Sequence, residues 1–126
     1  MEKVTFHRFD PEIYPFLLYV GITKDIKDLQ SSFDCLDDGG MLRYEDLIGK
    51  SHGVTWILKD KKGFKSLVVT FKDKNSMTYQ NVAHESAHGA KFVFKQIDAE
   101  IEPHEPFEYL VGWIASKCEI VKKMKK

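Results

Sequence analysis

The chain has 126 residues, of which 43% are hydrophobic and 30% are charged. These proportions are typical of a soluble globular protein, and the length fits a single domain, residues 1–126, with a core of its own. The formal net charge is zero, which excludes a global electrostatic attraction to nucleic acid or to an anionic membrane. We therefore expect no nucleic acid and no membrane among its partners.

The cysteines also bear on where the protein works. There are two, Cys35 and Cys118, far apart in the sequence. One such pair is typical of free thiols in a reducing compartment rather than of a disulfide framework. The first residues contain no apolar stretch of signal-peptide length, and no segment has the apolar length of a membrane span. The expected location is the cytoplasm.

The first third of the chain predicts a strand followed by a helix. Residues 14–22 are an apolar run rich in strand-forming residues, which indicates a buried strand. Thr23 is a suitable N-cap for a short helix over about residues 24–33. The expected apolar stripe of that helix consists of Ile26, Leu29 and Phe33.

The middle of the chain predicts a β-hairpin. After a loop signal at Asp37-Asp38-Gly39-Gly40, a short strand is expected near residues 41–44 and one helical turn near 45–48. Residues 54–58 and 64–71 then form two strand-like runs on either side of the turn segment 59–63.

Two helices are expected in the last third. Asn75 or Ser76 is the expected cap of a long helix that runs to about residue 97. Its apolar positions recur at helical spacing and predict a core stripe of Ala83, Ala87, Ala90, Phe94 and Ile97. Pro103 and Pro106 mark the start of a final helix that ends near residue 122. Its expected stripe is Phe107, Leu110, Val111, Ile114, Cys118 and Val121.

These elements predict an α+β fold, in which a small antiparallel or mixed sheet packs on the long helix and on the C-terminal helix. Gly112 lies inside the final helix, where a glycine costs about 1 kcal/mol relative to alanine. Two explanations remain open, a close approach to the long helix and a position without consequence.

The long helix carries the most informative motif of the chain, His84-Glu85-Ser86-Ala87-His88. Two histidines four positions apart lie on one helical face, close enough for both imidazoles to bind one Zn²⁺. The glutamate after the first histidine can act as general base on water in a zinc hydrolase. We expect the histidines at the rim of the buried stripe, lining a cleft. The alternative is two solvent-exposed histidines on an amphipathic helix without a metal.

A catalytic zinc usually has three protein ligands, so one ligand must come from outside the motif. Glu105, in the first turn of the final helix, is the favoured third ligand. Its alternative role is that of a glutamate stabilised by the helix dipole. Glu108 could replace it, or accept a hydrogen bond from a ligand histidine. His104 could be a ligand or a donor in the cleft, and Tyr109 could offer its phenol to a substrate or simply pack.

The combination of His84, Glu85 and His88 with Glu105 in a following helix resembles the zincins, specifically the glutamate-liganded type typified by the thermolysin family. The whole chain is more closely similar to small uncharacterised HExxH proteins of phages and mobile elements, in which the motif recurs with a segment like Glu105-Pro106-Phe107-Glu108-Tyr109. The chain departs from the thermolysin pattern at Tyr109, where that family has an aspartate, and it has no separate substrate-binding domain.

The resemblance implies a zincin-like fold, a zinc cofactor and hydrolysis of a peptide or protein substrate with Glu85 as general base. The sequence thus predicts a zinc metallopeptidase. A second hypothesis is a non-catalytic zincin-fold protein of phage or mobile-element origin, which would bind or inhibit a partner through its surface.

Overall fold

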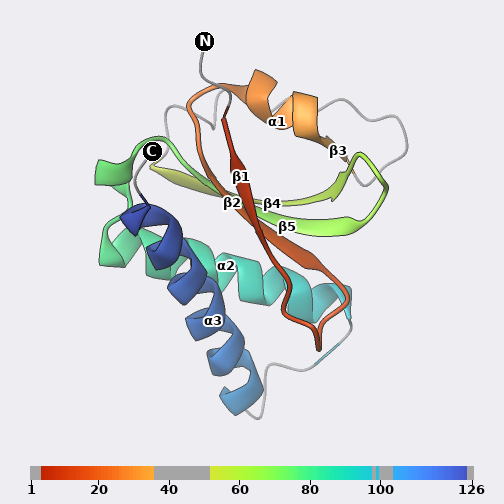
Figure 1. Ribbon diagram of the computed structural model, residues 1–126. Coiled ribbons are helices and arrows are strands. Elements are labelled where there is room, and N and C mark those ends of the chain that lie inside the picture. Colours follow the sequence, from red (N-terminus) through yellow and green to blue (C-terminus); the bar gives the residue numbers. More distant parts are fainter. Residues whose placement is uncertain (1–3, 36–51, 98, 100–103, 125–126) are drawn as a thin grey trace.

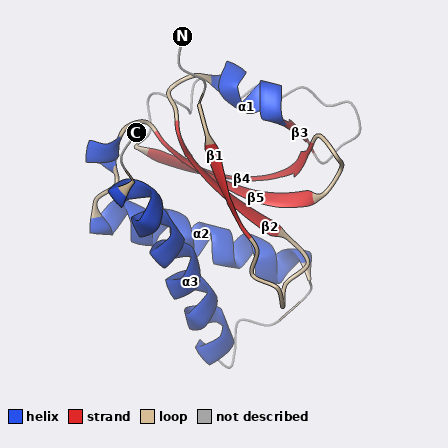
Figure 2. Cartoon of the chain, viewed as in Figure 1, coloured by secondary structure: helices blue, strands red, loops and turns tan. Residues whose placement is uncertain are grey.

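The fold is a mixed sheet with helices on both faces. The computed structural model describes residues 4–35, 52–97, 99 and 104–124, with the backbone alone at residues 104 and 105. Helices α2 (Tyr79–Gln96) and α3 (His104–Lys123) pack on one face of a five-stranded sheet, and α1 (Ile26–Ser32) lies on the other (Figure 1). The α+β class with a small mixed sheet is therefore confirmed, and the layers are clear when coloured by element type (Figure 2).

The strand order in the sheet is β1-β2-β5-β4-β3. The strands are β1 (Phe6–Phe9), β2 (Leu17–Ile22), β3 (Phe33–Cys35), β4 (Gly53–Asp60) and β5 (Lys65–Phe71). Only β2 and β5 are parallel, and every other neighbouring pair is antiparallel. The parallel pair is central, so that both of its strands are enclosed by neighbours on each side.

Strand β1 was not expected from the sequence. Its two apolar residues, Phe6 and Phe9, enclose two polar ones, so it lacks the alternation that marks a strand, and it pairs with β2 so that Phe6 lies opposite Gly21. A Cβ atom at Gly21 would lie 2.6 Å from the Phe6 ring, so glycine is needed there for the ring to cross the strand. The ring continues into an edge-to-face contact with Phe33, 5.1 Å between centroids.

The first predicted strand and helix exist with shifted boundaries. The strand begins at Leu17 rather than at residue 14, because residues 12–16 form bends. Asp25, not Thr23, caps α1, and its side chain accepts a hydrogen bond from the backbone N–H of Lys27. Thr23, two residues before the cap, instead accepts from the N–H of Asp25, 3.0 Å away. Ile26, Leu29 and Phe33 are all buried, as predicted.

The hairpin is confirmed. β4 and β5 pair in antiparallel register from Gly53 opposite Phe71 to Lys59 opposite Lys65. The turn between them is held by Asp60, whose carboxylate accepts from the backbone N–H groups of Lys62 and Phe64. Gly63 has a φ of 90°, which a glycine adopts without strain. The short strand and helical turn predicted for residues 41–48 lie outside the described residues.

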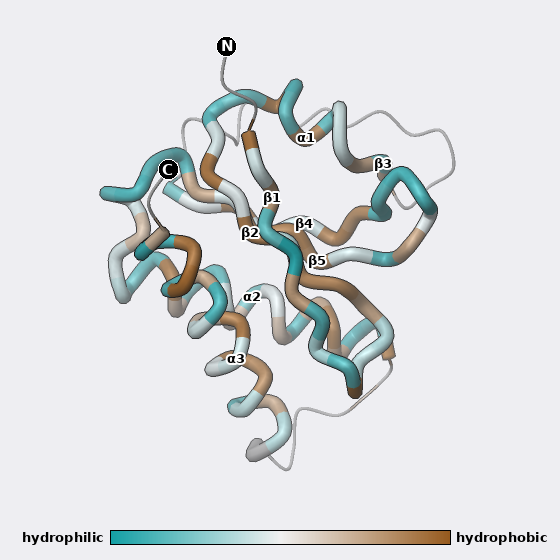
Figure 3. Tube along the Cα trace, viewed as in Figure 1, coloured by the Kyte–Doolittle hydropathy of each residue, from teal (hydrophilic) through white to brown (hydrophobic). Residues whose placement is uncertain are grey.

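The core has two parts, one on each side of the sheet. The larger lies between β2, β5, α2 and α3, and the smaller lies under α1. In Figure 3 the hydrophobic colours gather along the central strands and α3, whereas the turn between β4 and β5 is hydrophilic. The predicted stripe of α3 is confirmed, with Leu110, Ile114, Cys118 and Val121 buried and Phe107 and Val111 packed against them. None of the described helices has the length and apolarity needed to cross a membrane.

Candidate metal site

The histidine motif lies in the first half of α2, and the sequence around Thr78 determines where this helix begins. The Thr78 side chain accepts a hydrogen bond from the backbone N–H of Asn81, 3.1 Å away, and is the N-cap. The predicted caps, Asn75 and Ser76, are wrong for α2. They belong to a preceding 3-10 turn (Lys74–Ser76), whose own cap is Asp73. Asp73 therefore caps the 3-10 turn, and Thr78, five residues later, caps α2.

The two histidines of the motif face each other across one helical turn. The Nε2 atoms of His84 and His88 are 3.1 Å apart, and the ring centroids are 4.6 Å apart at 85°. His88 also stacks on Phe92, with 6.3 Å between centroids. When both imidazoles are neutral, the N–H of one can donate to the bare nitrogen of the other. The pair thus brings two ring nitrogens within hydrogen-bond distance of each other.

The pair is exposed, so the expectation that it lies at the rim of the buried stripe is wrong. Ala83 is exposed, Ala87 is half-buried and Ile97 is exposed, and only Ala90 and Phe94 of the predicted stripe are buried. The face that packs on the sheet and α3 consists of Val82, Glu85, Ser86, Gly89, Ala90, Val93 and Phe94. It includes two polar side chains and a glycine, which a hydrophobicity pattern does not select.

Gly89 rather than Gly112 is the glycine of close approach between the helices. A Cβ atom at Gly89 would lie 2.9 Å from Leu67 on β5 and 3.3 Å from Ile114 on α3. By contrast, a Cβ atom at Gly112 would meet no atom within 4 Å, and Gly112 is exposed. The close approach therefore belongs to the position directly after His88.

Glu85, next to His84 in the sequence, is buried on the face of α2 that packs on the sheet, with 7% of its surface exposed. Its carboxylate oxygen Oε1 accepts a hydrogen bond from the hydroxyl of Thr55 on β4, 2.6 Å away, and the same hydroxyl lies 3.2 Å from the Glu85 carbonyl oxygen. Gly53, on the same strand, makes room for the carboxylate stem, because a Cβ atom there would lie 3.0 Å from Glu85 Cγ. Sequence reasoning did not find Thr55 or Gly53, since nothing in a strand pattern marks a partner for a helix residue.

Two further groups lie on this buried face. Burial, and to a smaller extent the negative charge of Glu85, raise the pKa of the Cys118 thiol to about 12. The Ser86 hydroxyl is fully buried and has no hydrogen-bond partner among the described residues. The interior around Glu85 is therefore poor in polar partners, which makes the Thr55 bond the main contact of its carboxylate.

The candidates for a third ligand lie at the start of α3. Phe107 contacts Phe94 edge-to-face at 5.4 Å, so α3 begins beside the C-terminal end of α2 and then runs back along it. Glu108 and Tyr109 are exposed, and 73% of the Tyr109 surface is open to solvent. The side chains of Glu105 and His104 lie outside the described residues. Within the described part, no three His, Cys, Asp or Glu side chains lie close enough together to hold a metal ion.

Comparison with known proteins gives no relative. The chain matches no family model, no curated protein and no solved structure.

Proposed function

We propose that this chain is a zinc-dependent metallopeptidase of zincin type. His84, His88 and Glu105 hold one Zn²⁺, and Glu85 is the general base for hydrolysis of a peptide bond. The observation that carries the proposal is the facing pair of imidazoles, 3.1 Å between Nε2 atoms, one residue away from a buried glutamate.

The two nitrogens fit a zinc ion. Nitrogens bound at about 2.0–2.1 Å in a tetrahedral shell lie roughly 3.3–3.4 Å from each other. The 3.1 Å between the two Nε2 atoms is close to that spacing. Both rings are exposed, so a metal and a substrate can reach them from solvent. The described residues supply two of the ligands, and the proposal assigns the third to Glu105 on α3.

The chemistry would be divided between the metal and Glu85. Zinc supplies Lewis-acid activation of water and of the substrate carbonyl. Glu85 accepts the proton of the attacking water on its carboxylate and passes it to the leaving amine. Thr55 holds one carboxylate oxygen of Glu85 through its hydroxyl, which leaves the other oxygen as the proton acceptor. Thr55 is in this scheme a positioning residue.

The edge of the sheet supports a peptide as substrate. Among the described residues, β3 pairs only with Leu58, Lys59 and Asp60 of β4. Residues 53–57 of β4 therefore present backbone groups on a side where no described strand pairs with them. An extended peptide can add to such an edge through main-chain hydrogen bonds. Thr55 lies within this stretch, so the edge and the general base are neighbours.

One observation favours the second function, a non-catalytic binding protein with a zincin-like fold. The bond between Thr55 and Glu85 joins α2 to β4 and gives the glutamate a structural role without any reaction. In that case the exposed histidines would be surface residues, and the protein would act by masking a partner. The two functions predict different effects on peptide cleavage when the charge of the Glu85 carboxylate is removed.

Metal content tests the site first. The purified protein, supplied with zinc and dialysed, is expected to retain about one Zn²⁺ per chain, measured by elemental analysis. His84→Gln and His88→Gln should each lower the zinc affinity strongly. His7→Gln is the matched control, since His7 lies on β1 away from α2. Equal retention of zinc in all three variants would remove the proposed site.

Turnover then separates the two functions. Glu85→Gln keeps the size of the side chain and a polar acceptor for Thr55, so fold and zinc content should persist. Cleavage of a peptide library, followed by mass spectrometry, is expected to fall by about 10²–10⁴-fold in this variant. If wild-type protein with bound zinc cleaves no peptide, or if Glu85→Gln cleaves as fast as wild type, the peptidase proposal fails.

A further inference from the structure

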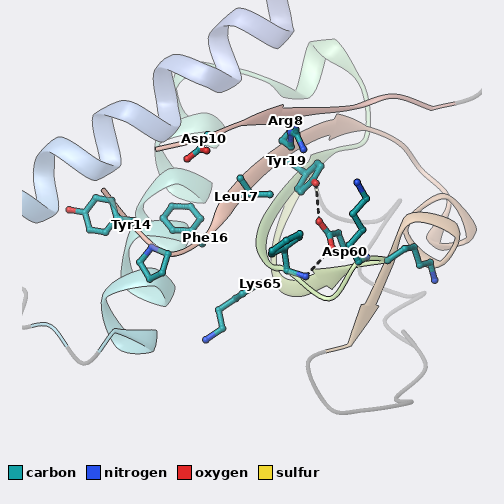
Figure 4. A pocket seen from close by; sticks show the side chains of 12 residues that line it. Arg8, Asp10, Tyr14, Phe16, Leu17, Tyr19, Asp60 and Lys65 are labelled. Carbon is teal, nitrogen blue, oxygen red and sulfur yellow. Dashed lines mark hydrogen bonds between the residues drawn. The ribbon is translucent and has the colours of Figure 1, made fainter. Parts of the chain in front are cut away.

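A pocket of about 850 Å³ lies at the end of the sheet where β2 and β5 begin (Figure 4). Its walls come from the end of β1, the segment leading into β2, and the turn between β4 and β5. No residue of α2 lines it, so it is separate from the histidine pair. The volume is in the range of small-molecule sites, about 300–1,000 Å³.

One wall of the pocket is a fixed polar group built around Tyr19. The Tyr19 hydroxyl donates to Asp60 Oδ2 across 3.3 Å, and the other oxygen of Asp60 accepts the two backbone N–H groups of its turn (Figure 4). Burial and the negative charge of Asp60 raise the pKa of Tyr19, so the phenol stays neutral. Arg8 lies on the same side and interacts with the Tyr19 hydroxyl. The Asp60 carboxylate is thus occupied by three donors.

The pocket carries an excess of positive charge. Its lining includes Arg8, Lys61, Lys62 and Lys65 but only two carboxylates, Asp10 and Asp60. Lys61 is paired with Asp34 at 2.9 Å, and Lys65 bonds to the neutral amide of Gln96. Over the part of the chain that the structure describes, Arg8 forms no ion pair with a carboxylate. In a chain of zero net charge, this local excess indicates an anionic ligand.

Aromatic side chains line the rest of the pocket. Tyr14, Phe16 and Tyr19 come from the β2 side, and Phe64 comes from the turn opposite. Phe64 is 59% exposed, although covering an aromatic ring is favourable. A pocket lined by an exposed ring and by a guanidinium that forms no ion pair with a described carboxylate is suited to a molecule that has both an apolar plane and a negative charge.

We propose that this pocket binds a small organic anion that consists of a planar ring and an oxyanion group. Arg8 contacts the oxyanion, and Phe64 contacts the ring. A carboxylate and a phosphate share the geometry that an arginine fork recognises, so both are members of this class. The proposal is independent of the metal site, because it uses none of its residues.

The complete probes are phenyl phosphate and benzoate. Inorganic phosphate and phenol test the oxyanion and the ring separately. Titration of the full chain, followed by amide chemical shifts in NMR, is expected to show saturable changes around Arg8, Tyr19 and Phe64 with at least one of the two complete probes. Each half alone should bind more weakly than the complete probe. The comparison of phenyl phosphate with benzoate identifies which oxyanion the site prefers. No saturable change with either complete probe would overturn the proposal.

Variants locate the binding. Arg8→Gln and Phe64→Ala are each expected to weaken binding of the better probe by about tenfold or more. Both residues are exposed, so the fold should persist, and the unbound NMR spectrum checks this. Arg8→Lys keeps the charge and loses the fork, so its affinity should fall between Arg8→Gln and wild type. Lys91→Gln, which removes an exposed charge from α2, is the control. Equal affinities in Arg8→Gln and Lys91→Gln would also overturn the proposal.

Discussion

The hydroxyl of Thr55 on β4 lies 2.6 Å from the carboxylate of Glu85 on α2, and it is the donor of the bond between them. This bond crosses from β4, the strand next to β3 at one side of the described sheet, to the helix that carries the histidines. It also gives a buried carboxylate a partner in surroundings that are otherwise apolar. The orientation of Glu85 therefore depends on a strand residue 30 positions earlier in the chain.

Replacement of Thr55 tests this bond. Thr55→Val keeps the shape of the side chain but removes the donor, which leaves the Glu85 carboxylate buried without it. The free energy of unfolding is expected to fall by about 1.5–3 kcal/mol, the value typical of a hydrogen bond to a charged group. Urea unfolding measures the change. Thr55→Ser keeps the hydroxyl and should lose much less, and equal losses in the two variants would contradict the assignment.

The buried face of α2 could not be predicted from apolar spacing. A pattern of alanines and large apolar residues selects Ala83 and Ile97, both of which are exposed. The buried face instead contains Glu85, because Thr55 satisfies it, and Gly89, because two neighbouring side chains occupy the space of a Cβ atom. Both reasons depend on residues that are far away in the sequence. By contrast, the β4–β5 hairpin depends on a local turn and on local alternation, and it was predicted correctly.

The two helical glycines should respond in opposite ways to alanine. Gly89→Ala places a Cβ atom against Leu67 and Ile114, both fully buried, and overpacking of this kind costs about 1–3 kcal/mol. This cost outweighs the gain of helix propensity. Gly112→Ala meets open space and should stabilise the protein by up to about 1 kcal/mol. Thermal unfolding of both variants checks the signs, and stabilisation by Gly89→Ala would show that α2 does not pack as described.

The Cys118 thiol predicts a loss of stability at high pH. Its pKa is about 12 in the folded protein and 9.0 in its ordinary state, so the folded protein holds the thiol proton more tightly. Between these values the unfolded chain binds fewer protons than the folded one, and the free energy of unfolding falls as the pH rises. Below pH 9 the thiol has no such effect.

A comparison with Cys118→Val isolates this contribution from that of other groups that titrate at high pH. The valine variant lacks the thiol and should lose less stability than wild type between pH 9 and 11, measured by urea unfolding at each pH. Parallel curves for the two proteins would mean that Cys118 does not retain its proton on folding.

The motif itself was readable from the sequence, since two histidines at helical spacing face each other wherever the helix forms. The exposure of the two histidines could not be read from the sequence, because it depends on which face of α2 the sheet and α3 cover. The caps show a second limit. Asp73 and Thr78 are both good capping residues, and the chain uses one for a 3-10 turn and the other for α2. The choice between successive caps depends on where Met77 and Val82 are buried.

Zinc affinity in single variants can decide which residue, Glu105 or Glu108, is the third ligand of the proposed site. Glu105 and Glu108 both belong to the first turns of α3, whose start lies beside the end of α2 through the contact of Phe94 with Phe107. Phe94 is six residues beyond His88, about 9 Å along the helix axis, so the start of α3 lies about that far beyond the histidines along α2.

Glu105 is preferred because it matches the position of the ligand in the thermolysin-type pattern, directly before Pro106. Glu105→Ala is expected to weaken zinc binding about 10–100-fold or more, as removal of a ligand or its direct partner does, and Glu108→Ala is expected to weaken it much less. Competition with a chromogenic chelator measures both affinities, and circular dichroism checks that α3 remains intact. The reverse order would transfer the ligand role to Glu108. Unchanged affinity in both variants would mean that the histidine pair obtains its third ligand from outside this turn of α3.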